Sequence, residues 1–455
     1  MDAKSLRSLK PELELFLSRY APLFGRDENQ AHARTIVQGL LAGGERRNVE
    51  NMAEAAADGV VRTLQKFIAQ GVWDDRSVLA ELRTDVVEVL GDEDAVLILD
   101  ETGFPKKGTK SVGVARQYSG TLGRIDNCQI GVFVNYCSRH GHTLFDRRLF
   151  LPESWTQDRE RCAAAGVPTG VIFRTKPDLA GEMVEQACRE GVPFRWVAGD
   201  SVYGSNPTFL QTLRLLKKWY VMDVTSSARA WTNAPAMRPV GRTSRRGGRP
   251  TRNEKPLVKP RPVEELIAEI PAAAWKRVQV AEGSQGSRLY EYAELTVWFS
   301  EESLPTEQPE RLLVRRSLGQ DLEIKFQRSN APASVPLQKL AEVAGCRWCV
   351  EQDFQSGKGE CGLDEYETRG WIGWHHHTAL SLLALWFLTL QKVRLGKKTS
   401  PAHRSRSPRR AASPARPAGL GRSRDPQLEP METRAKPRRQ ALPRTTPPRR
   451  TPAAK

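Results

Sequence analysis

The chain has 455 residues, which is enough for two or three domains with a large hydrophobic core. Its formal net charge of +17 at pH 7 favours a nucleic-acid-binding protein. Seven cysteines form no dense disulfide framework in a chain of this length, and the longest apolar run, residues 378–390, is too short to span a bilayer. The N-terminus lacks the apolar run of a signal peptide, so we expect a soluble cytoplasmic protein.

The positive charge is concentrated at the C-terminal end. Residues 397–455 contain seventeen Lys/Arg and three Asp/Glu and therefore carry +14, while residues 1–396 carry only +3. The segment is rich in Arg, Pro, Ser and Ala without apolar periodicity, which predicts a disordered basic tail. The folded part must then bind any nucleic acid through local patches. Because a core helix runs directly into this composition, a second hypothesis is that the tail is a frameshifted translation of GC-rich DNA.

The first 92 residues are predicted to be helical. Leu13, Phe16, Leu17 and Tyr20 recur at helical spacing, and no strand pattern interrupts the region. A basic pair at Arg46 and Arg47 is compatible with an ordinary solvated surface. A helical module before a catalytic core is also a common way to dock on DNA, so we predict that residues 1–92 form a helical DNA-binding domain.

Residues 93–226 show the pattern of a mixed α/β core. The unbroken apolar run 96–99 predicts a strand that is covered on both faces. Three strands are followed by alternating helices and strands, which is the succession of a ribonuclease-H-like fold with a mixed five-stranded sheet. The predicted strands are 94–100, 128–136, 143–151, 194–200 and 219–224, and the helices are 178–189 and 207–216.

Two of these strands end in an aspartate. Asp100 follows the first strand and Asp200 follows the fourth. Open α/β folds place their chemistry at the carboxyl ends of sheet strands, so the two residues predict a metal site that needs a third carboxylate. Glu101 is next to Asp100, but adjacent strand residues point to opposite faces, so we expect it to take no part.

Residues 227–335 interrupt the core. The stretch 229–262 has ten Lys/Arg and one acid, which predicts a basic linker. Within it, Arg249 belongs to an Arg-Gly-Gly-Arg-Pro sequence that resembles a minor-groove hook, although a flexible linker touching phosphates is the simpler alternative. Alternating residues in 277–280, 289–299 and 311–326 then predict an all-β insertion.

The core resumes in residues 336–396, where a helix over 337–358 carries the third carboxylate. Arg347, Glu351 and Lys358 are four and seven residues apart, so at about 100° per residue they share one stripe of the helix. An Arg/Glu pair at this spacing is by default a surface ion pair. Because Glu351 follows two strand-end aspartates in the chain, we favour a metal site instead.

These segments together resemble the DDE transposases of bacterial insertion sequences, in the group with the signature Y-x2-R-x3-E-x6-K. The insertion-sequence family numbered seven-oh-one is the most similar. The signature's Tyr falls on Ala344, which is a departure from the pattern. The matching segments are 99–108, 198–204, 347–351, 358–360 and 370–377.

The resemblance implies a DNA transposase that cuts and joins strands at the ends of an insertion sequence. It implies that Asp100, Asp200 and Glu351 hold two Mg²⁺ ions, which Mn²⁺ can replace, and that Arg347 and Lys358 hold phosphates. Trp298 is a candidate for holding a base that leaves the stack. The implied partners are double-stranded DNA, as terminal inverted repeats and target, and a second copy in a synaptic homodimer. The implied location is cytoplasmic and nucleoid-associated, with no membrane.

Three alternatives remain open at this point. Cys346, Cys349, Cys361 and His375 could bind zinc, although no second close cysteine pair follows. The protein could be a catalytically inactive or truncated transposase derivative that only binds DNA. It could also be a ribonuclease-H-type nuclease without strand transfer.

Overall fold

The computed structural model describes residues 3–42, 46–55, 60–120, 123–238, 255–283, 286–319 and 322–399. Two features expected above lie outside these residues. One is Arg249 with its surrounding hook sequence, and the other is the tail from residue 400 onward.

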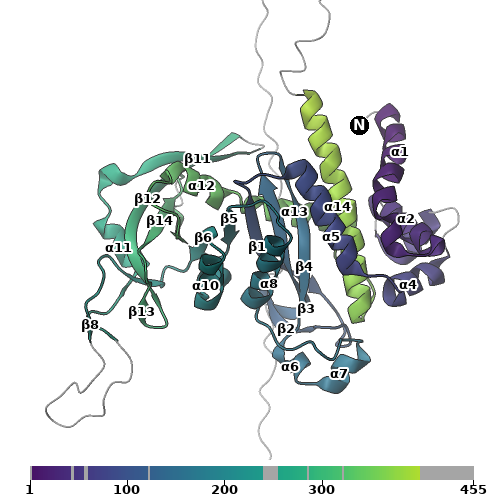
Figure 1. The fold of residues 1–455 in the computed structure, drawn as a ribbon, viewed down its shortest axis with the longest axis horizontal. Helices are drawn as coiled ribbons and strands as arrows, with labels where there is room; N and C mark the ends of the chain where they lie inside the picture. Colours follow the sequence, from purple (N-terminus) through teal and green to yellow (C-terminus); the bar gives the residue numbers. More distant parts are fainter. Residues whose placement is uncertain are drawn as a thin grey trace, which may run out of the picture. The chain divides into compact units, whose positions relative to one another are not determined.

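A mixed sheet forms the centre of the protein (Figure 1). Strand β1 pairs antiparallel with β3 and parallel with β5, and β5 pairs parallel with β6. The order β4-β3-β1-β5-β6 therefore places β1 in the middle, where residues 96–99 are at most 4% exposed, as the unbroken apolar run predicts. The core strands are β1 (Val96–Pro105), β2 (Ala115–Ser119), β3 (Arg124–Ser138), β4 (Gly141–Phe150), β5 (Trp196–Gly199) and β6 (Trp219–Val224).

The sheet continues beyond the five expected strands, because β15 pairs antiparallel with β6. Among the described residues it contains 13 strands. The segment expected as one strand over 311–326 is two strands, and Ser317-Leu318-Gly319 interrupts its alternation. The further strands are β7 (Arg229–Trp231), β10 (Arg261–Pro262), β11 (Lys276–Gly283), β12 (Gly286–Glu301), β13 (Leu304–Pro305), β14 (Glu310–Arg316) and β15 (Ile324–Ser329), with β8 (Met237–Arg238) and β9 (Lys255–Pro256) as a separate pair.

The extension has its own apolar cluster. Val263 and Leu266 on a short helix pack with Val297, Leu312 and Val314 from the strands, and all five are completely buried. The region is therefore not purely β. Its short helical elements are α11 (Val263–Leu266), η2 (Ile267–Glu269) and η3 (Ala272–Ala274).

Helices cover both faces of the core sheet. Figure 1 shows α8 and α10 in front of the sheet and α13 behind it. Helix α8 begins two residues earlier than expected, because Thr175 and Asp178 form a capping box around its first turn. The helices that connect or cover the core strands are α6 (Glu153–Thr156), α7 (Arg159–Ala164), α8 (Lys176–Arg189), α9 (Ser201–Gly204), α10 (Pro207–Leu215), α12 (Leu337–Gly345) and α13 (Trp348–Cys361).

The N-terminal residues are helical, as expected, and surround the last helix of the fold, α14 (Trp371–Thr399) (Figure 1). The Asp85 carboxylate joins three helices, since it accepts hydrogen bonds from Tyr20 Oη (2.7 Å), Trp386 Nε1 (2.8 Å) and Arg19 Nη1 (3.2 Å). The N-terminal elements are α1 (Ala3–Tyr20), η1 (Ala21–Phe24), α2 (Asp27–Leu41), α3 (Val49–Ala55), α4 (Val61–Gln70) and α5 (Asp75–Leu90).

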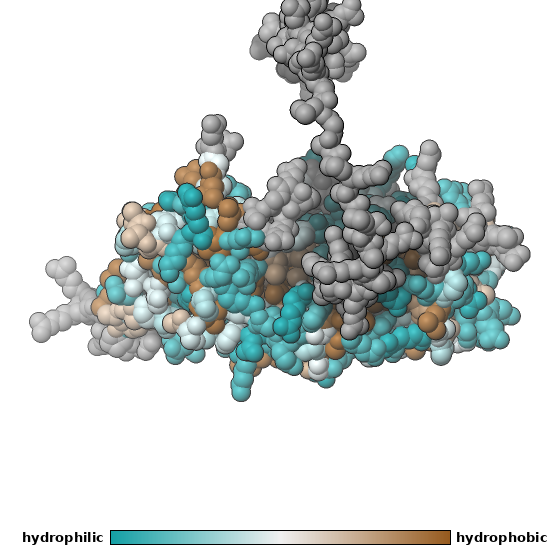
Figure 2. Space-filling model, turned by 90° about the horizontal axis from the view of Figure 1, so that it is seen from above, coloured by the Kyte–Doolittle hydropathy of each residue, from teal (hydrophilic) through white to brown (hydrophobic). Residues whose placement is uncertain are grey.

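Helix α14 is the long apolar helix that the sequence places in the core. Residues Trp371–Leu395 are long and apolar enough to cross a membrane, but most of this stretch is buried inside the protein. Leu380, Leu383 and Trp386 are completely buried. On the coloured part of the face in Figure 2, apolar residues are interspersed with hydrophilic ones. The helix is therefore a core helix of the fold.

Replacing Asp85 by Ala should lower the free energy of unfolding by about 3 kcal/mol, because the buried Tyr20 hydroxyl and Trp386 indole N–H would lose their acceptor. Chemical denaturation monitored by tryptophan fluorescence measures the change. Glu28→Ala, which removes an exposed acid from α2, is the matched control and should change stability by less than about 0.5 kcal/mol. Equal effects of the two substitutions would contradict this role of Asp85.

Candidate active site

Three carboxylates meet where the pairing of β1 with β5 ends. Strand β1 itself continues to Pro105 along β3, so Asp100 does not end its strand as predicted. Each of Asp100, Glu101 and Asp200 offers one carboxylate oxygen, and these oxygens lie within 4.8 Å of one another. The parallel pairing of β1 with β5 ends at Leu99↔Gly199, so the next residue on each strand emerges at the same edge. Asp200 is held there as the N-cap of α9 and accepts a hydrogen bond from the Val202 backbone N–H. The two aspartates thus lie together.

The expectation that the Glu101 side chain points away from Asp100 is wrong, because the two carboxylates lie in one cluster with Asp200. β1 has no β5 partner beyond Leu99, so this side of the strand faces helices instead. Lys176 at the start of α8 donates to Glu101 Oε1 (2.6 Å), and Tyr203 on α9 donates to Oε2 (3.0 Å). The Asp100 carboxylate also folds back to accept from the Glu101 backbone N–H (2.8 Å). Simple strand alternation does not apply here, because these contacts draw both side chains to the open edge.

Burial makes the cluster electrostatically costly without a cation. Burial raises the pKa of Asp100 to about 7, Arg347 opposes the increase, and the neighbouring charges of Glu101 and Asp200 add to it. Burial also raises the pKa of Asp200, again with a contribution from Glu101. A divalent cation would stabilise the ionised carboxylates, and oxygen ligands of this kind suit Mg²⁺ or Mn²⁺. The residues present therefore fit a metal site.

Arg347 reaches this cluster, whereas Glu351 stays outside it. The expected continuous helix breaks at Cys346-Arg347 into α12 and α13. The Arg347 guanidinium donates to Asp223 Oδ2 (2.5 Å) and lies 3.8 Å from Asp100 Oδ2. Glu351 is exposed and lines a cavity of about 220 Å³ together with Arg347 and Asp223. Among the described residues, the cluster of possible metal ligands comprises only the three acids named above.

Helix α13 is anchored to the sheet by its other face. Asp353 is 2% exposed, and its Oδ2 accepts from Asn135 Nδ2 on β3 (2.5 Å) and lies 2.9 Å from His142 Nδ1 on β4. Cys349 Sγ lies 3.4 Å from Cys137 Sγ, also on β3. These contacts fix the rotation of the helix that carries Glu351 and begins next to Arg347.

Two lysines lie near the end of β1. Lys358 Nζ lies 3.4 Å from the Gly103 carbonyl oxygen, and burial lowers its pKa. Lys106 was assigned no role from the sequence. Its Nζ donates to the Tyr366 carbonyl (3.2 Å) and lies 3.6 Å from the Tyr366 ring centroid, and burial lowers its pKa to about 8. Because burial disfavours both charges, a phosphate beside them would stabilise the protonated forms.

Of the functional candidates at this site, Glu101 is expected from the sequence to have no role, and Lys176, Tyr203 and Asp223 are missed in the sequence. Asp223 had a detectable signal, because it lies near the end of the predicted strand 219–224. Lys176 and Tyr203 reach the site through the packing of α8 and α9, which was not predicted from the sequence. Trp298 is half-buried on β12, where its backbone pairs with that of Trp231 in β7.

The zinc ligand set is not assembled in the described part of the chain. The three adjacent histidines of α14 bind backbone carbonyl oxygens instead. His375 Nδ1 contacts Trp371 O (2.9 Å), His376 Nε2 contacts Trp73 O (3.1 Å), and His377 Nε2 contacts Gly362 O (2.8 Å). They are satisfied core residues.

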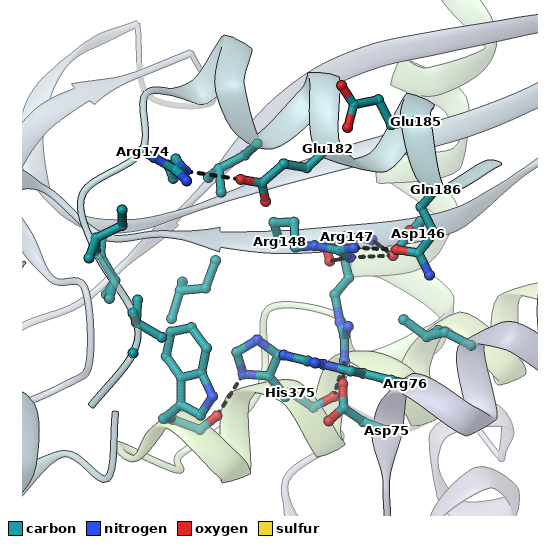
Figure 3. Close-up of a pocket in the computed structure, with 18 of the residues that line it drawn as sticks. Asp75, Arg76, Asp146, Arg147, Arg148, Arg174, Glu182, Glu185, Gln186 and His375 are labelled. Carbon is teal, nitrogen blue, oxygen red and sulfur yellow. Dashed lines mark hydrogen bonds and ion pairs between the residues drawn. The ribbon is translucent and has the colours of Figure 1, made fainter. Parts of the chain in front are cut away.

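A separate cavity of about 520 Å³ lies between α5, α8, β4 and α14 (Figure 3). Its charged side chains are largely paired with one another. Arg147 contacts Asp75 (2.7 Å), Arg148 contacts Asp146 (2.8 Å), and Arg174 contacts Glu182 (3.0 Å), as the close-up shows in part. With these charges compensated internally, the cavity is a weaker candidate than the carboxylate cluster.

Comparison with known proteins identifies the family of the chain. Residues 19–287 match the family model of the DDE superfamily endonucleases, and the chain belongs to that family. It is 31% identical over 193 residues to the probable transposase for insertion sequence element IS701 of Microchaete diplosiphon. The match covers 42% of this chain and 47% of the relative, so the chain spans about half the length of the curated relative it matches. The resemblance to DDE transposases is thereby confirmed.

A solved structure is also similar, but only weakly. The NurA nuclease from Sulfolobus solfataricus matches with a TM-score of 0.26 and 8% sequence identity, over 75% of this chain and 95% of that chain. A likeness this low carries no weight for the fold or the site.

The raised pKa of Asp100 predicts a pH-dependent stability. A carboxyl whose pKa is about 7 when folded and 3.8 otherwise binds its proton more tightly in the folded state. Its contribution is fully present below pH 4 and is lost as the pH rises through 7, which amounts to about 2–4 kcal/mol of unfolding free energy. Asp100→Asn should remove this decline in metal-free buffer with EDTA, as measured by denaturant unfolding from pH 4 to 8.

The control for this measurement is Glu93→Gln, which neutralises an exposed acid just before β1 and should leave the decline unchanged. A wild-type profile that is flat across this range, or one that Asp100→Asn does not alter, would contradict the assignment.

Proposed function

We propose that the protein is a DNA transposase that cleaves DNA and joins strands at the ends of an insertion sequence by a cut-and-paste reaction. The observation that carries this proposal is the meeting of Asp100 and Asp200 directly after the paired residues of two parallel strands, in a chain of the DDE endonuclease family. The similarity to the probable transposase of IS701 supports the same reaction.

The proposed catalytic core is ribonuclease-H-like. The strand order β4-β3-β1-β5-β6 supports it, because three antiparallel strands are followed by two strands parallel to β1. The proposed domains are a helical DNA-binding domain (1–92), the core (93–226 and 336–396), the basic linker with the β-rich insertion (227–335) and a disordered basic tail (397–455).

The proposed metal ligands are Asp100, Asp200 and Glu351, which would hold two Mg²⁺ ions. Bound metal would activate the attacking water or DNA 3′-hydroxyl and stabilise the leaving oxygen. The protein residues position the reactants. Asp100 and Asp200 are held by strand pairing and by the cap of α9, and Glu351 is on a helix anchored through Asp353. Its exposure leaves it available to a cation between the helix and the strands.

The proposed DNA contacts begin with Arg347 and Lys358. Arg347 now bridges Asp223 and Asp100, and its planar guanidinium suits bidentate contact with a phosphate. Lys358 is held near Gly103, where a phosphate would offset the cost of its burial. Arg249 in the linker and Trp298 on β12 are further candidates, the first for the minor groove and the second for stacking on an unpaired base.

The proposed partners are the terminal inverted repeats of the element, the target DNA and a second copy of the protein in a synaptic homodimer. The proposed location is the bacterial nucleoid. Negatively charged DNA would favour a protein with this net charge.

A strand-joining assay with Mg²⁺ and DNA carrying the element's terminal repeats tests the proposal. Asp200→Asn should keep the α9 cap, because Asn is as good an N-cap as Asp, yet it removes a charged metal ligand. Joining should fall by at least about a hundredfold while DNA binding, measured by fluorescence anisotropy, changes little. Glu93→Gln should join DNA as the wild type does.

Two outcomes would replace the proposal with an alternative. If the wild type binds the ends but neither cuts nor joins them, the protein is a DNA-binding derivative without catalysis. If it cuts but forms no joined product under any metal condition, it is a nuclease.

A further inference from the structure

We propose that Glu101 is a ligand of the divalent cation held by Asp100 and Asp200 when the protein is free of DNA. This inference rests on the proposed function and adds a residue to its metal site. It is based on the position of the Glu101 side chain rather than on any sequence motif.

The first observation is proximity. The Glu101 carboxylate is one of three whose ligand atoms lie within 4.8 Å of one another, and the other two belong to Asp100 and Asp200. A cation that binds Asp100 and Asp200 would therefore lie close to Glu101 as well. By contrast, Glu351 is not a member of this cluster. In the free protein, the third nearby carboxylate is the one next to Asp100.

The second observation is that Glu101 is held in place. Its two oxygens accept from Lys176 Nζ and Tyr203 Oη, which come from two different helices. The side chain is only 15% exposed, so few other rotamers are open to it. Each carboxylate oxygen has more than one lone pair and can accept a hydrogen bond and still bind a cation. The carboxylate is thus held in one orientation and still has lone pairs that can bind a cation.

The third observation is charge balance. Lys176 lies 2.6 Å from Glu101, whereas Arg347 lies 3.8 Å from Asp100 and is shared with Asp223 at 2.5 Å, so the two cationic side chains offset the acids only in part. The remaining negative charge favours a bound divalent cation. Lys176 is therefore a positioning residue, since it acts through Glu101, while Glu101 itself would touch the cation.

The inference implies a change of ligands during the reaction. Glu101 would complete the site in the free protein, whereas Glu351, which lies outside the cluster, would contribute only with DNA bound. The metal affinity of the free protein should then depend on Glu101 more than on Glu351. A triad of Asp100, Asp200 and Glu351 in the free protein predicts the opposite order, so the two hypotheses can be distinguished by the metal affinity of the variants.

Titration of the full-length protein with Mn²⁺, without DNA, tests it. Free Mn²⁺ is measured by electron paramagnetic resonance, so the readout does not depend on activity. Glu101→Gln should weaken Mn²⁺ binding about tenfold or more, whereas Glu351→Gln and the control Glu93→Gln should change it less than about threefold. Circular dichroism verifies that each variant is folded.

Glu101→Asp is a second variant in case the glutamine variant does not fold. It keeps the charge but withdraws the carboxylate by one methylene, so the same weakening is expected. Wild-type affinity in a folded Glu101→Gln or Glu101→Asp variant would overturn the inference.

Asp100→Asn distinguishes this failure from failure of the proposed function. If Asp100→Asn abolishes Mn²⁺ binding and the Glu101 variants do not weaken it, the metal site stands and only the role of Glu101 is wrong. If Asp100→Asn also binds Mn²⁺ with wild-type affinity, the proposed metal site is wrong, and so is the inference about Glu101.

Discussion

The parallel pairing of β1 with β5 is the constraint on which the site depends. The two strands are aligned by four consecutive residue pairs, from Val96↔Trp196 to Leu99↔Gly199. An aspartate follows both residues of the last pair. A slip of one residue between these strands would displace Asp100 from Asp200 by about 3.3 Å along the strand direction. The paired residues Leu97, Ile98, Val197 and Ala198 are completely buried, so the core packs around this pairing. The pairing that builds the core therefore also places the two aspartates together.

The charged side chains around the carboxylate cluster gather at the same edge of the sheet. The parallel pairing of β1, β5 and β6 ends there, and Asp223 near the end of β6 adds a further acid that binds Arg347. The positively charged groups come from elements packed on opposite faces, Lys176 from α8 and Arg347 from the start of α13. Their pairing with Glu101 and Asp223 explains how the acids coexist in a partly buried place. It also suggests which contacts a DNA phosphate would have to replace.

Much of the architecture was predictable, because it depends on local periodicity. The run at 96–99, the alternation at 289–299 and the helical spacing near Leu13 each correspond to an element of the expected type. The predictions that were wrong concern places where segments distant in the sequence pack together. The segment 311–326 forms two strands, the helix from 337 breaks at Cys346-Arg347, and the insertion strands extend the core sheet through β15 and β6. Edge pairing between remote strands leaves little trace in the sequence.

The sequence by itself determined that Asp100 and Asp200 directly follow two buried apolar runs, because an apolar run and the acid that follows it are local features. It also determined that Arg347 and Glu351 are near neighbours on a helical segment. Only the tertiary structure decided that Glu101 joins the two aspartates, that Lys176 and Tyr203 hold it, and that Arg347 binds Asp223. The physical reason is that side-chain direction at an unpaired strand edge is set by the helices packed beside it, and their positions depend on the whole core.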